Sequence, residues 1–125
     1  MRKILFKAKR KDNGEWVEGL PIMMWGMLHI QDSKNENTAY AIDPDTLCQY
    51  TGYTDNNGRK IWENDIVDTF EESSKEILRN VVKFKDGCFK VFKKHYLSMY
   101  LDSYEKTDLK AVGNIFDALE LLKED

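Results

Sequence analysis

The chain has 125 residues, of which 42% are hydrophobic and 33% are charged, and its net charge is −3 at pH 7. This size and composition suit a globular protein with one core or two small lobes. The net charge is too close to neutral to indicate nucleic-acid or membrane binding by itself, and no apolar run approaches the roughly 18–20 residues needed to cross a bilayer. We therefore expect a cytoplasmic protein with no membrane partner, and residues 1–7 do not resemble a signal peptide.

The first part of the chain is predicted to form short strands separated by turns. Ile4, Phe6 and Ala8 occupy alternate positions, with Lys7 and Lys9 on the opposite face, and a turn at residues 12–15 leads into a strand over 16–20. Pro21 is expected at a strand edge or break. Residues 22–30 are apolar almost throughout, and the flanking Pro21 and internal Gly26 favour a buried strand over a helix.

An exposed loop is predicted over residues 31–37, followed by a strand over 38–42. Pro44 then has the position of the first residue of a turn or a single 3-10 turn. The boundary between two lobes is placed near residue 48. The prediction is an N-terminal β lobe over residues 1–48 and a C-terminal β-barrel-like lobe with a terminal helix over residues 49–125.

Residues 49–67 contain the strongest local signals in the chain. The pair Asn57-Gly58 predicts a type I′ hairpin turn, in which both central residues have φ > 0. Residues 63–65 should then turn the chain before a strand begins at Ile66. The residues expected to hold this motif together are Gly52, Asn57, Gly58, Trp62 and Asp65.

The remainder of the chain predicts two more strands, a last strand and a helix. An acidic stretch over residues 68–75 indicates a mobile connection, and Asp86-Gly87 predicts a hairpin between strands over 77–85 and 88–93. A last strand is expected over 109–114. Asp117 and Glu120 have the spacing of a capping box that begins a short C-terminal helix. The predicted fold class is mainly β, with small antiparallel sheets or a partly open barrel built from hairpins in two lobes.

No pattern in the sequence indicates catalysis, a metal or a cofactor. Glu63 and Asp65 are interpreted as side chains of a tight corner rather than an acid–base pair. His29 is expected to be packed and His95 solvated. Together with the thiols of Cys48 and Cys88, these histidines lack the spacing of zinc ligands. We therefore predict a non-enzymatic protein with reduced cysteines.

Three segments resemble the YopX family of phage and prophage proteins. The central one reads Gln-Tyr-Thr-Gly from residue 49 and continues through Asn57-Gly58 to Glu-Asn-Asp-Ile-Val at 63–67. Residues 7–17 resemble the opening of the family and residues 112–122 its close. The resemblance implies a small, mostly β protein in a bacterial host, with no established activity. Two departures are Asn64, where relatives usually have Gly, and Ala118-Leu119, where they commonly have Asn-Pro.

Aromatic and methionine content suggests an interaction surface. The chain has three Trp, six Tyr, six Phe and five Met, and these residue types are enriched where proteins contact one another. We expect a homo-oligomer that also contacts a phage or host protein. The residues predicted to form an exposed apolar patch are Met23, Trp25, Met27 and Tyr53.

A nucleic-acid-binding small β-barrel protein is the alternative. Lysines concentrate in the two strands around residues 83–94, and a nearby tyrosine ring offers a surface on which a base can stack. The same lysines also suit exposed strands that must resist edge-to-edge pairing. The candidate contacts are Lys83, Lys85, Lys90, Lys93, Lys94 and Tyr96.

Overall fold

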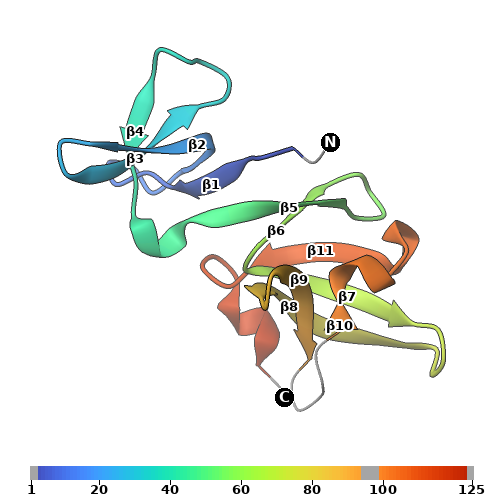
Figure 1. Cartoon of the computed structure of the whole chain (residues 1–125). Coiled ribbons are helices and arrows are strands. Elements are labelled where there is room, and N and C mark those ends of the chain that lie inside the picture. The colour runs from blue at the N-terminus through green and yellow to red at the C-terminus, as the bar shows by residue number, and fades with distance from the viewer. Residues whose placement is uncertain (1–2, 94–98, 124–125) are drawn as a thin grey trace. The chain divides into compact units, whose positions relative to one another are not determined.

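The structure is a computed structural model that describes residues 3–93 and 99–123 (Figure 1). The chain divides into two compact units, residues 1–50 and 51–125. All strand pairs are antiparallel, with the order β4-β3-β2-β1-β5-β6 in one sheet and β10-β9-β8-β7-β11 in the other. The predicted mainly β class built from antiparallel sheets is confirmed. Over the described residues the two sheets do not close into a barrel, and every helix there is a 3-10 turn rather than the predicted C-terminal helix.

The first unit is a meander of strands around a small core. Its turn at Gly14 has φ +74°, as expected for a hairpin. The core contains Ala8, Val17, Ile30 and Ile42. The elements are β1 (Phe6–Lys9), β2 (Trp16–Met24), β3 (Met27–Asp32), β4 (Ala39–Ala41), the 3-10 turn η1 (Pro44–Thr46) and the start of β5 (Cys48–Thr54).

The predicted buried strand over residues 22–30 is wrong. The chain reverses at Trp25-Gly26, and this segment forms the end of β2 and most of β3. An apolar run usually indicates a buried strand, but the middle residues of this run lie at the exposed end of a hairpin. Pro21 pairs with Ile30 of β3 and lies beyond the part of β2 that pairs with β1, which is an edge position.

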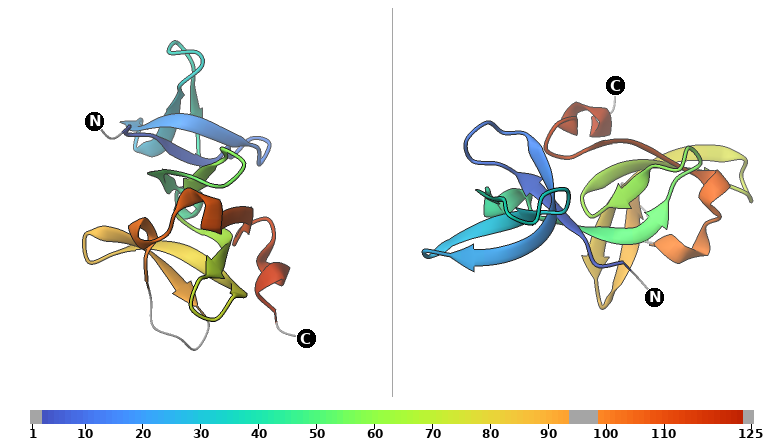
Figure 2. Two further views of the ribbon diagram at one scale, coloured as in Figure 1. Left: turned by 90° about the vertical axis from the view of Figure 1, so that its right-hand side faces the viewer. Right: turned by 90° about the horizontal axis from the view of Figure 1, so that it is seen from above.

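The second unit is a five-stranded sheet with a larger core. Two further views show its strands and the 3-10 turn near its C-terminal end (Figure 2). The predicted mobile connection over 68–75 is wrong, because β7 continues to Glu71 and only a tight turn separates it from β8. The elements are β6 (Lys60–Trp62), β7 (Asp65–Glu71), β8 (Glu76–Lys85), β9 (Cys88–Lys93), β10 (Met99–Tyr100), η2 (Leu101–Ser103), η3 (Lys106–Asp108), β11 (Leu109–Asn114) and η4 (Leu119–Leu122).

The turn between β5 and β6 differs in type from the prediction. Gly58 has φ +77°, whereas Asn57 does not have a positive φ. The Gly58 N–H donates to the Asp55 carbonyl at 3.0 Å, which closes a turn around residues 56 and 57 and leaves Gly58 as the left-handed residue after it. Asp55 explains the choice: its buried carboxylate accepts N–H groups of Asn57, Arg59 and Ala111, each at 2.9 Å. The last of these bonds ties the turn to β11.

The corner after β6 forms as predicted. Asn64 has φ +72°, the left-handed conformation that Asn tolerates better than most residues. The carboxylate of Asp65 accepts the Trp62 N–H at 2.8 Å. The side chains of Ile61, Trp62, Ile66 and Val67 are buried, so this segment supplies core residues to the second unit.

The C-terminal segment contradicts the predicted capping box. The 3-10 turn η4 begins after Ala118, with no side-chain cap, and Asp117 lies outside it. Asn114 organises the approach instead, because its Oδ1 accepts N–H groups of Phe116 and Asp117, each at 2.9 Å. A Cβ on Gly113 would lie 3.0 Å from the Ala118 side chain. Close packing against β11, rather than a cap, therefore holds this segment.

Candidate interaction surfaces

The β2–β3 hairpin ends in a two-residue turn with unusual residues. Met24 pairs with Met27, and between them Trp25 has φ +50° and Gly26 has φ +73°. Two successive positive φ values define a type I′ turn, which normally selects Asn, Asp or Gly. A bulky residue at the first position is a conformational outlier. The backbone therefore tolerates a tryptophan where the turn itself favours a small polar residue.

Large apolar side chains are exposed along this hairpin. Trp25 is 87% exposed, Met23 65% and Met27 42%. Apart from His29, residues 19–31 contain no ionisable side chain, so no charge interrupts this exposed apolar surface. We call this surface the tip; its members are Leu20, Ile22, Met23, Trp25 and Met27.

Three of the four residues predicted to form an apolar patch belong to the tip. Tyr53 is also exposed, but it lies on the part of β5 that belongs to the second unit. The structure thus brings Met23, Trp25 and Met27 together on one hairpin and assigns Tyr53 to another region.

The indole of Trp25 has one aromatic neighbour. Its ring centroid lies 6.1 Å from that of His29, with an edge-to-face angle of 71°. His29 is buried as predicted, and its Nδ1 is 2.9 Å from the Met27 carbonyl oxygen. A pocket of about 340 Å³ lies beside these rings, between the hairpin and the loop that contains Glu36. This contact orients the indole while leaving most of its surface exposed.

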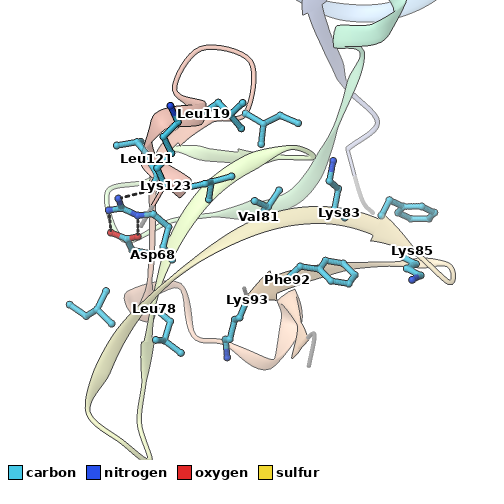
Figure 3. Close-up of a pocket in the computed structure, with 15 residues that line it drawn as sticks. Asp68, Leu78, Val81, Lys83, Lys85, Phe92, Lys93, Leu119, Leu121 and Lys123 are labelled. Atoms are coloured by element: carbon cyan, nitrogen blue, oxygen red, sulfur yellow. Dashed lines mark hydrogen bonds and ion pairs between the residues drawn. The ribbon is translucent and has the colours of Figure 1, made fainter. Parts of the chain in front are cut away.

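A wide apolar groove crosses the second unit. It has a volume of about 1110 Å³ and is lined by β8, β9 and the C-terminal segment (Figure 3). Arg79 connects its two sides, because its guanidinium pairs with Asp68 at 2.8 Å and donates to the Leu121 carbonyl at 3.3 Å. The apolar lining residues are Ile77, Leu78, Val81, Phe84, Phe92, Ile115, Leu119, Leu121 and Leu122.

Basic side chains surround the groove. Lys83 donates to the neutral amide oxygen of Asn64 at 2.5 Å, and Lys85 lies 5.9 Å from the centre of the Phe92 ring. Neither partner carries a negative charge, so these contacts do not offset the cationic character of the two side chains beside the apolar floor. Lys123 adds a third cation from the C-terminal segment. The groove therefore combines an apolar floor with a positive border.

The lysines predicted to contact nucleic acid do not share one environment. Lys83 pairs with Lys90 across β8 and β9, so these two lie on the same sheet face. Lys90 forms an ion pair with Asp86 at 3.5 Å. Lys93 forms an ion pair with Glu71 at 2.9 Å, and only 9% of the Lys93 side chain is exposed. Lys94 and Tyr96 lie outside the residues that the structure describes, as does His95.

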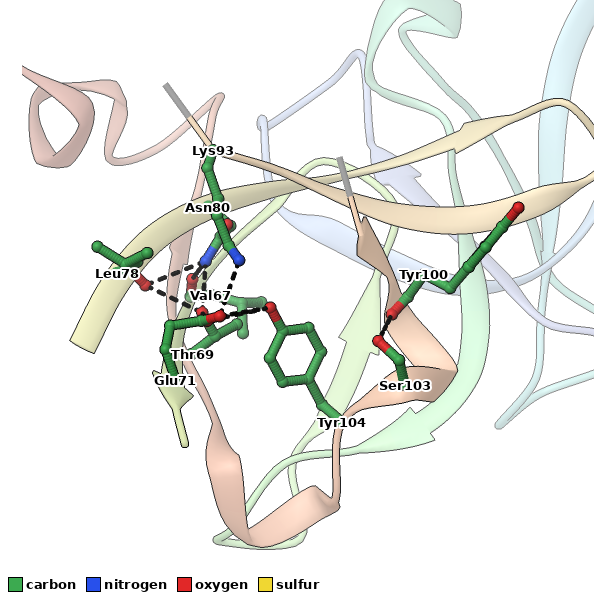
Figure 4. Close-up of polar contacts among 9 residues, drawn as sticks. All are labelled: Val67, Thr69, Glu71, Leu78, Asn80, Lys93, Tyr100, Ser103 and Tyr104. Atoms are coloured by element: carbon green, nitrogen blue, oxygen red, sulfur yellow. Dashed lines mark hydrogen bonds and ion pairs between the residues drawn. The ribbon is translucent and has the colours of Figure 1, made fainter. Parts of the chain in front are cut away.

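Lys93 belongs to a polar cluster inside the second unit (Figure 4). The Glu71 carboxylate accepts bonds from Lys93, the Tyr104 hydroxyl at 3.0 Å and the Thr69 hydroxyl at 2.5 Å. Burial disfavours the charged carboxylate, but these three bonds outweigh it and hold the pKa of Glu71 below its usual value. Asn80 extends the cluster by donating to Thr69 at 2.9 Å. No sequence pattern predicted this cluster, because its members are far apart in the chain.

The structure also describes the cysteines, the possible metal-ligating side chains and the helices. Cys48 and Cys88 are free thiols. Within residues 3–93 and 99–123, His, Cys, Asp and Glu side chains do not gather into a group of three that suits a metal ion. The same residues include no helix that is long and apolar enough to span a bilayer.

These features define a small all-β protein built from two antiparallel units, with an apolar hairpin tip in one and an apolar groove in the other. The chain belongs to the YopX family, because the model of the YopX protein matches residues 6–123. The resemblance noted in the sequence is thereby confirmed.

The structure is also similar to a solved one, the crystal structure of protein EF1440 from Enterococcus faecalis. The two chains are 21% identical, the match covers 98% of this chain and 100% of that chain, and the TM-score is 0.64. This likeness shows the fold. A comparison with curated proteins finds no match.

Proposed function

We propose that this protein is a protein-interaction module that self-associates through the tip. The observation that carries the proposal is Trp25, which is 87% exposed at the end of a hairpin. Tryptophan is among the residues most enriched at the energetic centre of protein interfaces. Exposed Met23 and Met27 on either side supply adaptable apolar contact area around it.

The backbone at Trp25 supports an interaction role over a structural one. A left-handed conformation costs a non-glycine residue roughly 1–2 kcal/mol, and the exposed indole recovers little of this by burial within its own unit. Residues held in unfavourable backbone conformations concentrate at functional sites. An interface that buries the indole offsets this cost, whereas an isolated hairpin does not.

The proposal is tested by measuring self-association as a function of concentration. Sedimentation velocity on the full chain should show a concentration-dependent oligomer, and Trp25→Asn should weaken it about 30-fold or more, as removal of a central aromatic does at interfaces. Asn suits the left-handed position, so the turn is retained.

Ile4→Ala is the matched control, since Ile4 is 67% exposed in the same unit but lies outside the tip. This variant should associate like the unmodified chain. A chain that stays monomeric at all concentrations, or a Trp25→Asn variant that associates normally, contradicts the proposal.

A further inference from the structure

We propose that the groove of the second unit is the receptor for the tip of another copy of this chain. The contact is therefore heterologous: the hairpin of one molecule lies in the groove of the next. This inference rests on the proposed self-association and names the surface that the tip binds.

The groove has the size and chemistry of a site for a protein segment. Small-molecule pockets measure roughly 300–1,000 Å³, and the groove, at about 1110 Å³, exceeds that range. Two of its apolar residues remain strongly exposed, Ile77 at 70% and Leu119 at 56%. Exposed apolar area that is rimmed by polar groups marks an interaction site. A hairpin end that presents Trp25 offers matching apolar area.

Charge complementarity selects the tip as the occupant. The border of the groove is positive, with Lys83, Lys85 and Lys123 beside the apolar floor. The uncharged run at the tip is followed by Asp32, whereas Glu18 at its other end lies opposite Lys7 of β1. Glu36 lines the pocket beside Trp25, and the only cation of the adjoining loop is Lys34. An apolar centre with acidic flanks therefore meets an apolar floor with a basic border.

The pairing of unlike surfaces has a consequence for assembly. Two molecules that each place the tip in the groove of the other form a closed dimer with two copies of the contact. The buried area is then twice that of one contact, which brings it closer to the roughly 1,600 Å² of a stable interface. A contact that does not close in this way produces a ring or an open chain. A contact of tip with tip, by contrast, leaves the groove unused.

The experiment uses two variants that disable opposite sides of the contact. Trp25→Asn removes the indole at the centre of the tip and leaves the groove unchanged. The double variant Ile77→Lys/Leu119→Lys places two charges in the groove at positions that are already exposed, and it keeps the tip. Met99→Lys is the control, because Met99 is 43% exposed in the same unit but does not line the groove.

We expect each disabling variant alone to associate at least about 30-fold more weakly than the unmodified chain. Mixing the two should restore one intact contact and yield a heterodimer in sedimentation, detected with a fluorescent label on one partner. Circular dichroism of each variant confirms that it is folded.

The outcomes separate this inference from the proposed function. If the groove variant associates like the unmodified chain while Trp25→Asn does not, the tip mediates self-association but the groove is not its receptor. If both variants fail alone and the mixture also stays monomeric, the tip-in-groove contact is overturned. If neither variant weakens association, the proposed function fails as well.

Discussion

Two hairpins in this protein have the same turn geometry and opposite chemistry. In β2–β3 the turn residues are Trp25 and Gly26, and in β8–β9 they are Asp86 and Gly87, all four with positive φ. Asp-Gly is a usual sequence for this turn. Trp-Gly is not, because the bulky first residue is disfavoured in the left-handed conformation.

The difference separates residues that serve folding from residues that serve contact. Asp86 suits its turn, and its carboxylate accepts a bond from Lys90 on the same hairpin at 3.5 Å. Trp25 is unfavourable for its turn and presents its ring outward. A position where local conformation and residue type disagree indicates a function that local structure does not explain.

The largest expected effect comes from breaking the base of the first hairpin. A Cβ added to Gly19 would lie 1.7 Å from the backbone oxygen of Gln31 in the paired strand. Because that contact is impossible without separating β2 from β3, Gly19→Ala should destabilise the first unit by more than about 4 kcal/mol.

Urea unfolding followed by circular dichroism measures this change. Gly14→Ala is the control, since its φ is +74° but a Cβ there meets no atom within 4 Å, and it should cost only about 1 kcal/mol. Equal stabilities for the two variants would show that β2 and β3 are not paired at Gly19.

The corresponding substitution in the second hairpin removes an ion pair rather than creating a steric clash. Lys93→Met removes the cation that pairs with Glu71 inside the second unit. Loss of one partner of a largely buried pair costs about 3 kcal/mol. The double variant Glu71→Gln/Lys93→Met should recover part of that loss, because no unpaired charge remains. A double variant less stable than Lys93→Met in the same unfolding assay would contradict the pairing.

Exchanging the turn residues sharpens the comparison directly. Trp25→Asp should stabilise the protein by about 1 kcal/mol, since Asp adopts the left-handed conformation more readily, while abolishing self-association. Asp86→Trp should destabilise it by about 1 kcal/mol. Thermal unfolding and sedimentation of both variants test this. A Trp25→Asp variant that is less stable would mean that the indole stabilises its own hairpin.

The smallest effect expected is a dependence of stability on pH. The pKa of Glu71 is lower in the folded chain than its ordinary value of 4.5, because hydrogen bonds from Thr69, Lys93 and Tyr104 outweigh the effect of burial. Its contribution to stability is therefore complete above that ordinary value and is lost as the pH falls through the lower, folded pKa. Glu71→Gln should flatten the acid side of the profile of unfolding free energy against pH. An unchanged profile would rule out this contribution.

Local signals in the amino-acid sequence were sufficient for many elements. Gly14, Pro44, Asn64 and Asp86-Gly87 each have a conformational preference that acts over a few residues, and the structure confirms the turns and corners that they predict. The last strand, Leu109–Asn114, also has the predicted bounds. Such signals are readable because the backbone preference of a residue does not depend on distant partners.

Distant partners decided the rest. Residues 22–30 were predicted to be core because apolar residues usually are, but their pairing across Trp25-Gly26 places four of them at an exposed tip. Asp117 had the spacing of a helix cap, yet packing of the C-terminal segment against Gly113 of β11 set the start of η4. The groove and the cluster around Glu71 likewise join residues from separate strands. Burial and ion pairing are properties of neighbours in space, so only the tertiary structure assigned them.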